Sequence, residues 1–164
     1  MPGDAVDIWM GTLSKALGSC GGFIAGDRDL IRALKYSAPG LSLYTIGSAP
    51  SAVGAALAAV EILEREPERV ARVQARGRRM GELCREHGFD IGLSQGTPIT
   101  PVILGDKAGM ASVGLIQSGI NVNAIMAPSV PPGQERLRFF VTSEHTEEQL
   151  QTAVAAIDFV ISEL

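Results

Sequence analysis

The stretch from Asp7 to Gly26 reads DIWMGTLSKALGSCGGFIAG, and its order of apolar, small and hydroxyl residues points to both fold and function. The apolar run from Val6 to Met10 is typical of a short strand, and Gly22 to Gly26 is a second strand bounded by glycines. Between them, Gly11 to Gly22 forms a loop of small and hydroxyl residues that contains Lys15. The sequence therefore predicts two short strands with a lysine on the loop that joins them.

Lys15 has neighbours that suit a Schiff base to pyridoxal 5'-phosphate (PLP). An amine needs a lowered pKa to attack an aldehyde, and burial lowers it. Thr12, Ser14 and free backbone N–H groups can bind the phosphate, while glycines let the backbone approach a flat cofactor. A surface lysine among turn glycines explains the pattern equally well, so the residues alone leave both interpretations open. The other lysines, Lys35 and Lys107, have ordinary surface explanations.

Beyond this stretch, helical and strand patterns alternate. We predict a helix capped by Asp27, and a long helical stretch from about Pro50 to Glu86 that Pro67 kinks or splits. The remaining predicted elements are a strand over 99–104, a helix from Asp106 to Gly119, strands over 120–125 and 136–142, and a final helix that begins with a capping box of Thr146 and Gln149. This order predicts an α/β fold with helices on one side of a mostly antiparallel sheet.

The composition argues against several classes of protein. The chain has 164 residues, of which 46% are hydrophobic, and its 14 basic and 18 acidic side chains give a net charge of −4, without the basic field of a nucleic-acid binder. The two cysteines and two histidines lie too far apart in the sequence for a metal motif, and no apolar run of about 18 residues predicts a membrane span. The N-terminal residues lack the features of a signal peptide, so we expect a cytoplasmic protein.

Four stretches in the same order resemble the α-oxoamine synthase family of PLP-dependent enzymes. Asp7 to Gly26 resembles the family's PLP-lysine motif, and Leu43-Tyr44-Thr45 with Ser48-Ala49-Pro50 resembles the segment that reaches the phosphate of a neighbouring subunit's cofactor. Residues 98–105 resemble the strand that opens the C-terminal domain, and residues 119–146 resemble the signature that leads to the substrate-binding arginine. The resemblance covers essentially the whole chain.

The resemblance implies the C-terminal part of a PLP-transferase fold. Residues 1–48 would be a segment of the PLP-binding large domain, including the lysine motif. Residues 49–164 would be a long linking helix and a small α/β domain with a mostly antiparallel sheet. We expect the stable core in residues 49–164, and residues 1–48 to be frayed or paired with another chain because their strand edges have lost the parent sheet.

The resemblance also assigns roles to four residues. Lys15 would form the Schiff base with PLP and later move protons at the substrate's α-carbon, and Thr12 would bind the phosphate in the same active site. Thr45 would bind the phosphate across a homodimer interface, although Ile46 stands where relatives often carry a second polar residue. Arg138 would hold the amino acid's carboxylate. The strand pattern is compatible with this role, because Leu137, Phe139 and Val141 form an apolar face and Arg138 lies on the opposite, outer face. A surface strand arginine is nevertheless the more ordinary explanation.

The implied reaction is the decarboxylative condensation of an amino acid (glycine, alanine or serine) with an acyl thioester, giving an α-amino ketone. The acyl group would be carried by coenzyme A or by a carrier protein. In the family, the histidine that stacks on the PLP ring and the aspartate that pairs with its nitrogen come from earlier in the chain, and neither is found here. We therefore expect a fragment that is inactive alone.

Two alternatives remain at this point. One is a PLP-dependent aminotransferase of the same fold, because fold does not determine chemistry. The other is a C-terminal domain that dimerises without catalysing a reaction.

Overall fold

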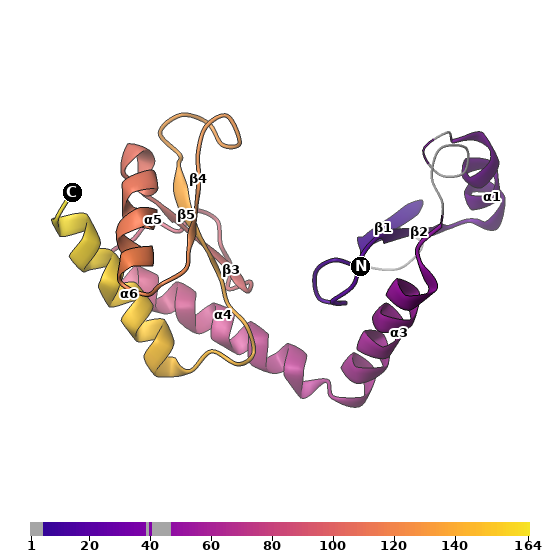
Figure 1. Ribbon diagram of the computed structural model, residues 1–164, viewed down its shortest axis with the longest axis horizontal. Coiled ribbons are helices and arrows are strands. Elements are labelled where there is room, and N and C mark those ends of the chain that lie inside the picture. The colour runs from indigo at the N-terminus through magenta and orange to yellow at the C-terminus, as the bar shows by residue number, and fades with distance from the viewer. Residues whose placement is uncertain (1–4, 39, 41–46) are drawn as a thin grey trace. The chain divides into compact units, whose positions relative to one another are not determined.

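The computed structural model describes residues 5–38, 40 and 47–164 (Figure 1). The chain divides into two compact units, Met1–Glu66 and Pro67–Leu164. The predicted division after residue 48 refers to the domains of a longer parent fold and stays a prediction. No helix in the described part of the chain is long and apolar enough to span a membrane.

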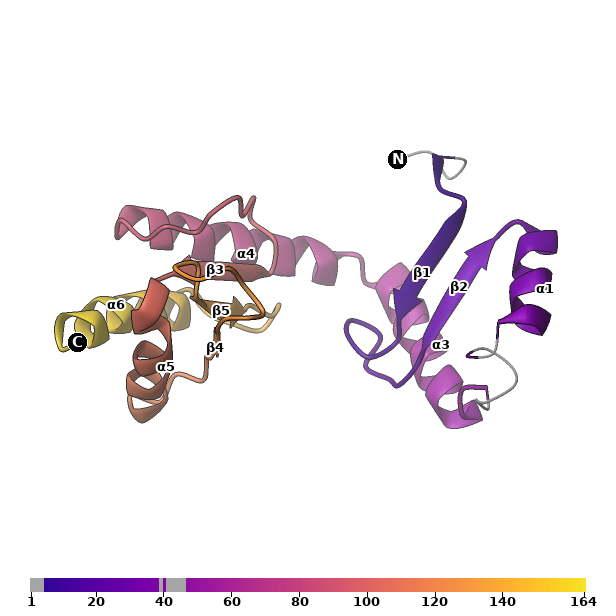
Figure 2. The same cartoon turned by 90° about the horizontal axis from the view of Figure 1, so that it is seen from above.

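A β-hairpin carries the lysine motif in the first unit. Strands β1 (Ile8–Thr12) and β2 (Gly22–Gly26) are antiparallel, with Thr12 opposite Gly22, and lie side by side in Figure 2. The predicted strand–loop–strand arrangement is therefore confirmed. The predicted start of the loop at Gly11 is wrong, because the ladder continues to Thr12. Glycine permits this close pairing, since a Cβ added to Gly22 would lie only 2.9 Å from the carbonyl oxygen of Gly11.

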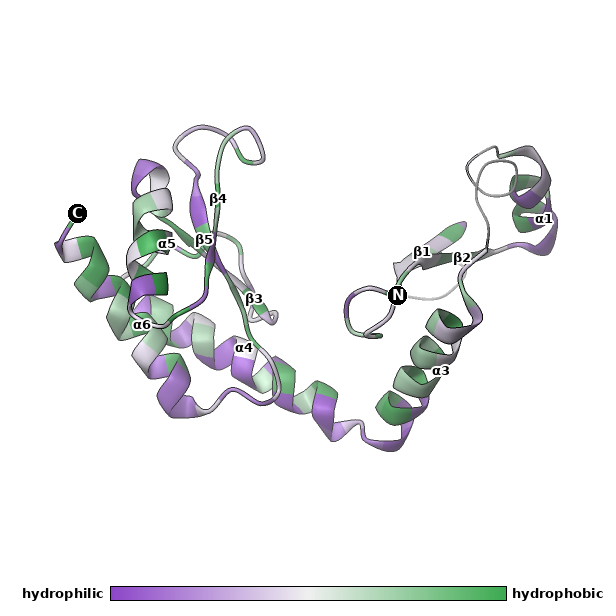
Figure 3. Ribbon diagram, in the orientation of Figure 1, coloured by the Kyte–Doolittle hydropathy of each residue, from purple (hydrophilic) through white to green (hydrophobic). Residues whose placement is uncertain are grey.

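Helices α1 and α3 complete the description of the first unit. Helix α1 (Arg28–Ser37) is capped as predicted, because the Asp27 carboxylate accepts hydrogen bonds from the backbone N–H groups of Asp29 and Leu30. Helix α3 (Pro50–Arg65) is largely hydrophobic along its length (Figure 3). Leu13 and Ala56 are nevertheless the only buried hydrophobic residues among those described in this unit.

The second unit is an antiparallel sheet with helices packed against one face. Its strands β3 (Ile99–Ile103), β4 (Asn123–Ile125) and β5 (Arg136–Phe140) are arranged in the order β3-β5-β4. Its helices are α4 (Glu68–Glu86), the 3-10 turn η2 (Gly105–Lys107), α5 (Ala108–Gln117) and α6 (Glu147–Ser162). The predicted antiparallel α/β architecture and the break between α3 and α4 at Pro67 are confirmed.

The core of the second unit lies between the sheet and its helices. Leu137 and Phe139 of β5 pack there with Val102 of β3, while Arg136 and Arg138 face the other way. The helices contribute the remaining large buried side chains, which are Met80, Leu83, Cys84, Leu115, Leu150, Val154, Ile157 and Val160. The alternation predicted for β5 is therefore confirmed, and it leaves one face of the sheet outside this core.

Two details of the second unit differ from the sequence-based expectations. Strand β4 begins at Asn123 rather than Ile120, because Ile120 donates its backbone N–H to Leu115 and the Val122 carbonyl accepts from the Ser112 hydroxyl. The predicted cap at Asp106 is wrong, because the chain enters α5 through η2 and the helix has no side-chain cap. The capping box at Thr146 is present as predicted.

Candidate functional site

The loop that carries Lys15 is closed by backbone hydrogen bonds. Leu13 donates its N–H to the Gly21 carbonyl over 2.9 Å, and Ser19 donates its N–H to the Leu13 carbonyl over 2.8 Å. Gly18 donates its N–H to the Lys15 carbonyl over 3.0 Å, with a φ of 57° in the left-handed region that favours glycine. Lys15 therefore lies on an ordered turn rather than on an open connection.

Two hydroxyl groups lie together directly before Lys15. The Thr12 and Ser14 hydroxyl oxygens are 2.7 Å apart, and the Ser14 backbone N–H donates to the Thr12 hydroxyl over 3.2 Å. Both residues are exposed. The loop thus presents neutral hydrogen-bond donors next to a primary amine, which is a donor set that fits an anionic group such as a phosphate.

The loop is attached to the start of α3. The Ser19 hydroxyl donates to the Ala52 carbonyl over 2.6 Å, and a Cβ added to Gly21 would lie 2.9 Å from the Ser48 hydroxyl oxygen. No local sequence pattern predicts this attachment, because it joins residues 33 positions apart. It fixes the lysine loop against the segment that follows Thr45, although Thr45 itself lies outside the described residues.

Lys15 is exposed, so the burial expected for its amine is not provided by the described residues. Within that part of the chain, the loop's hydrogen bonds to other segments run only to the start of α3. Lys15 is exposed because β1 and β2 form a two-stranded sheet, which cannot enclose a side chain by itself.

Arg138 lies in the second unit, on the face of β5 that points away from the core. In the sheet it is opposite Pro101 of β3 and Asn123 of β4. Its side chain is exposed, and its guanidinium carbon lies 5.0 Å from the centre of the Phe140 ring. The predicted position on the outer face is therefore confirmed, while the predicted role stays a prediction.

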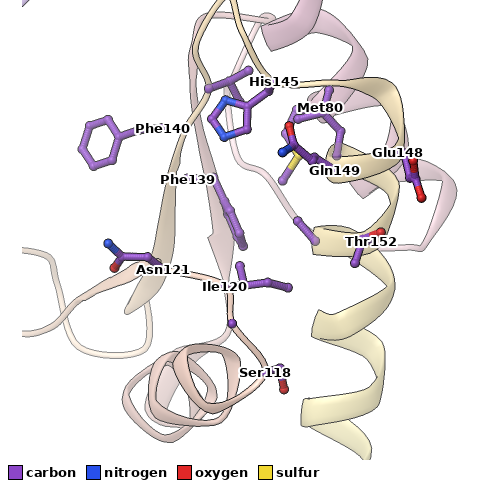
Figure 4. A pocket seen from close by; sticks show the side chains of 14 residues that line it. Met80, Ser118, Ile120, Asn121, Phe139, Phe140, His145, Glu148, Gln149 and Thr152 are labelled. Carbon is purple, nitrogen blue, oxygen red and sulfur yellow. The ribbon is translucent and has the colours of Figure 1, made fainter.

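A separate hollow of about 460 Å³ lies between β5 and the N-terminal turns of α6 (Figure 4). None of the predicted site residues that the structure describes, Thr12, Lys15 and Arg138, lines it. His145 does, and its Nδ1 accepts a hydrogen bond from the Thr142 backbone N–H over 3.0 Å. This contact agrees with a structural role for His145 at the start of the last helix.

The two cysteines differ in their surroundings, since Cys20 is exposed on the lysine loop. Both are free, and Cys84 is buried in the core of the second unit, where burial raises the pKa of its thiol to about 11. No group of three or more potential metal-ligating side chains occurs among residues 5–38, 40 and 47–164.

The sequence of residues 1–157 matches the family described as aminotransferase class I and II. The chain belongs to this family. It is 44% identical over 161 residues to an 8-amino-7-oxononanoate synthase from Symbiobacterium thermophilum, and 43% identical over 151 residues to one from Fervidobacterium nodosum. The matches cover 97% and 91% of this chain but only 41% and 38% of those relatives, so the chain spans about two fifths of their length.

Comparison with solved structures finds relatives with the same kinds of activity in their names. The serine palmitoyltransferase of Sphingomonas wittichii superimposes with a TM-score of 0.87 at 26% identity, over 98% of this chain and 41% of that one. The 8-amino-7-oxononanoate synthase of Francisella tularensis has a TM-score of 0.82 at 25% identity, over 95% and 46%. A further serine palmitoyltransferase with a TM-score of 0.87 was solved with PLP. Because these enzymes are α-oxoamine synthases, the resemblance to the C-terminal portion of that family is confirmed.

Proposed function

We propose that this chain is the C-terminal portion of a PLP-dependent α-oxoamine synthase, which condenses an amino acid with an acyl thioester, releases CO₂ and forms an α-amino ketone. The observation that carries the proposal is the lysine loop. Lys15 follows two hydroxyl groups 2.7 Å apart on a closed turn, in a chain that is 44% identical to an 8-amino-7-oxononanoate synthase.

The roles proposed for the site residues follow from their chemistry. The Lys15 amine would hold PLP and, once released from it, would remove the proton from the substrate's α-carbon. Thr12 would donate a hydrogen bond to the phosphate from the same subunit, and Thr45 would do so from a second subunit of a homodimer. The guanidinium of Arg138 would bind the amino acid's carboxylate through two hydrogen bonds. When bound, PLP supplies the electron sink for the negative charge that forms at the α-carbon.

The name of the curated relatives helps to choose the amino acid. In 8-amino-7-oxononanoate, the amino group is on the carbon next to the ketone, and one further carbon ends the chain. Alanine supplies these last two carbons after it loses its carboxylate. We therefore favour alanine over glycine and serine, with the acyl group carried by coenzyme A or by a carrier protein.

The test uses the complete protein that contains this chain, supplied with carboxyl-labelled alanine and an acyl thioester. We expect labelled CO₂ and unlabelled α-amino ketone to form in equal amounts, and neither product to form in Lys15→Ala. A keto acid formed from the amino acid without CO₂ would contradict the proposal and support an aminotransferase. The 164-residue chain alone should form no ketone, because the family's ring-binding histidine and aspartate come from earlier in its sequences.

A further inference from the structure

The outer face of β5 carries two arginines in different states. The guanidinium of Arg136 donates to the Gln134 backbone carbonyl over 2.8 Å and to its side-chain oxygen over 3.2 Å. The side chain of Arg138, in contrast, makes no hydrogen bond or ion pair with any residue that the structure describes. Arg138 is therefore the arginine on this face whose N–H groups are available to a ligand.

Arg136 and Phe140 both share a strand face with Arg138, and of these two side chains it is Phe140 that contacts the Arg138 guanidinium. Residues two apart on a strand share a face, and the guanidinium carbon of Arg138 lies 5.0 Å from the centre of the Phe140 ring. Figure 4 shows the neighbouring ring of Phe139 on the opposite side of β5, towards α6. The Phe140 side chain is 53% exposed, so its ring is not committed to the core.

The contact between Arg138 and Phe140 restricts the guanidinium without occupying its donors. A cation placed over an aromatic face is attracted by the ring's quadrupole, while the N–H groups of a guanidinium lie in its own plane and can still donate to a ligand. An arginine side chain otherwise loses considerable rotamer freedom when it binds a ligand. A ring that already limits these rotamers leaves less entropy to be lost on binding.

We propose that Phe140 is a positioning residue, which holds the guanidinium of Arg138 ready to bind the carboxylate of the amino acid substrate. The proposal rests on the carboxylate-binding role given to Arg138 under the proposed function. The neighbours across the sheet fit this arrangement. Pro101 and Asn123, opposite Arg138 on the two flanking strands, carry no charge that would compete for the guanidinium.

The test compares Phe140→Leu, Phe140→Tyr and Phe159→Leu in the complete protein that contains this chain. Phe159 is a matched control, because it is a 65% exposed phenylalanine on α6. The dissociation constant of the amino acid is measured from the change in PLP absorbance, without acyl thioester, and KM and kcat are measured with it. We expect Phe140→Leu to weaken amino acid binding by about two- to fivefold and to raise KM more than kcat falls. Phe140→Tyr and Phe159→Leu should bind the amino acid like the unaltered protein.

Three results would overturn the positioning role. These are an unchanged dissociation constant in Phe140→Leu, a rise in KM for the acyl thioester instead of the amino acid, or equal losses in the Leu and Tyr variants. Each of them leaves PLP binding intact, so the proposed function would survive. An unaltered protein that takes up no PLP would instead overturn the proposed function, and the positioning role with it.

Discussion

At the scale of single residues, the charged side chains divide into those that hold elements together and those left free for ligands. Glu147 accepts a hydrogen bond from Arg79 Nε over 2.7 Å and lies 3.8 Å from a nitrogen of Arg76, so it links the start of α6 to α4. Lys15 and Arg138 make no ion pair with any described residue. The two charged residues assigned to the site are therefore not committed to ion pairs within the described part of the chain.

The Arg79–Glu147 contact predicts a pH dependence of stability. The hydrogen bond from Arg79 lowers the pKa of Glu147 below its ordinary value of 4.5. Because the folded pKa is depressed, the contact stabilises the folded state above about pH 4.5 and is lost as the pH falls through the lower, folded pKa. Glu147→Gln should therefore unfold at lower urea concentration than the unaltered chain at pH 7, with a difference that shrinks below pH 4.5.

Glu148→Gln is the matched control, because Glu148 makes no ion pair with the described residues. It should change the unfolding midpoint little at either pH. An equal difference between Glu147→Gln and the unaltered chain at pH 7 and pH 3 would contradict the assignment.

At the scale of elements, the sequence predicted what depends on local chemistry and missed what depends on tertiary contacts. Asp27, Pro67 and the Thr146 capping box act within a few residues of themselves, and each of them does what was predicted. Strand β4 is shorter than predicted because Ile120 bonds to α5, a choice that no local pattern reveals. The contact between Arg138 and Phe140 was also missed, although it is local and the spacing of two residues on one strand face was a usable signal.

Close packing of α4 gives a prediction at this scale. A Cβ added to Gly77 would lie 2.6 Å from the Thr97 carbonyl oxygen, whereas one added to Gly81 would meet Ile91 at an ordinary 3.5 Å. Alanine in place of a helix-interior glycine otherwise stabilises by about 1 kcal/mol. We therefore expect Gly77→Ala to lower the free energy of unfolding by about 1–3 kcal/mol. Gly81→Ala should leave it unchanged or raise it by up to about 1 kcal/mol.

Urea denaturation followed by circular dichroism compares the two glycine variants in one helix. Equal stability of Gly77→Ala and Gly81→Ala would show that the approach of Thr97 to α4 does not constrain this position.

At the scale of the whole molecule, the core and the lysine motif belong to different units. The cluster of buried hydrophobic residues lies in the second unit, whereas Leu13 and Ala56 are the only buried hydrophobic residues described in the first unit. The family and the α/β fold were predictable because four motifs occur in order along one chain. The exposure of Lys15 was not, because burial of a loop depends on the segments around it. The roles of Thr12, Lys15, Thr45 and Arg138 stay predictions.

This division predicts unequal protection from hydrogen exchange. Residues 6–26 form a two-stranded hairpin with little buried surface, whereas residues 99–142 include the strands of the second unit's core. Amide hydrogens in 6–26 should therefore exchange faster in the isolated chain, as measured by mass spectrometry of peptides. Equal protection of the two regions would mean that another chain or copy covers the hairpin.

Whether Lys15 holds PLP is tested most directly by mixing the complete protein that contains this chain with PLP, reducing with borohydride and mapping the modified lysine by mass spectrometry. Lys35 and Lys107 serve as internal controls, because they are the only other lysines of this chain. We predict a single stable adduct on Lys15, together with a visible absorption band before reduction that is absent in Lys15→Ala. No adduct, or scattered labelling of all three lysines, would contradict a PLP site built on this loop.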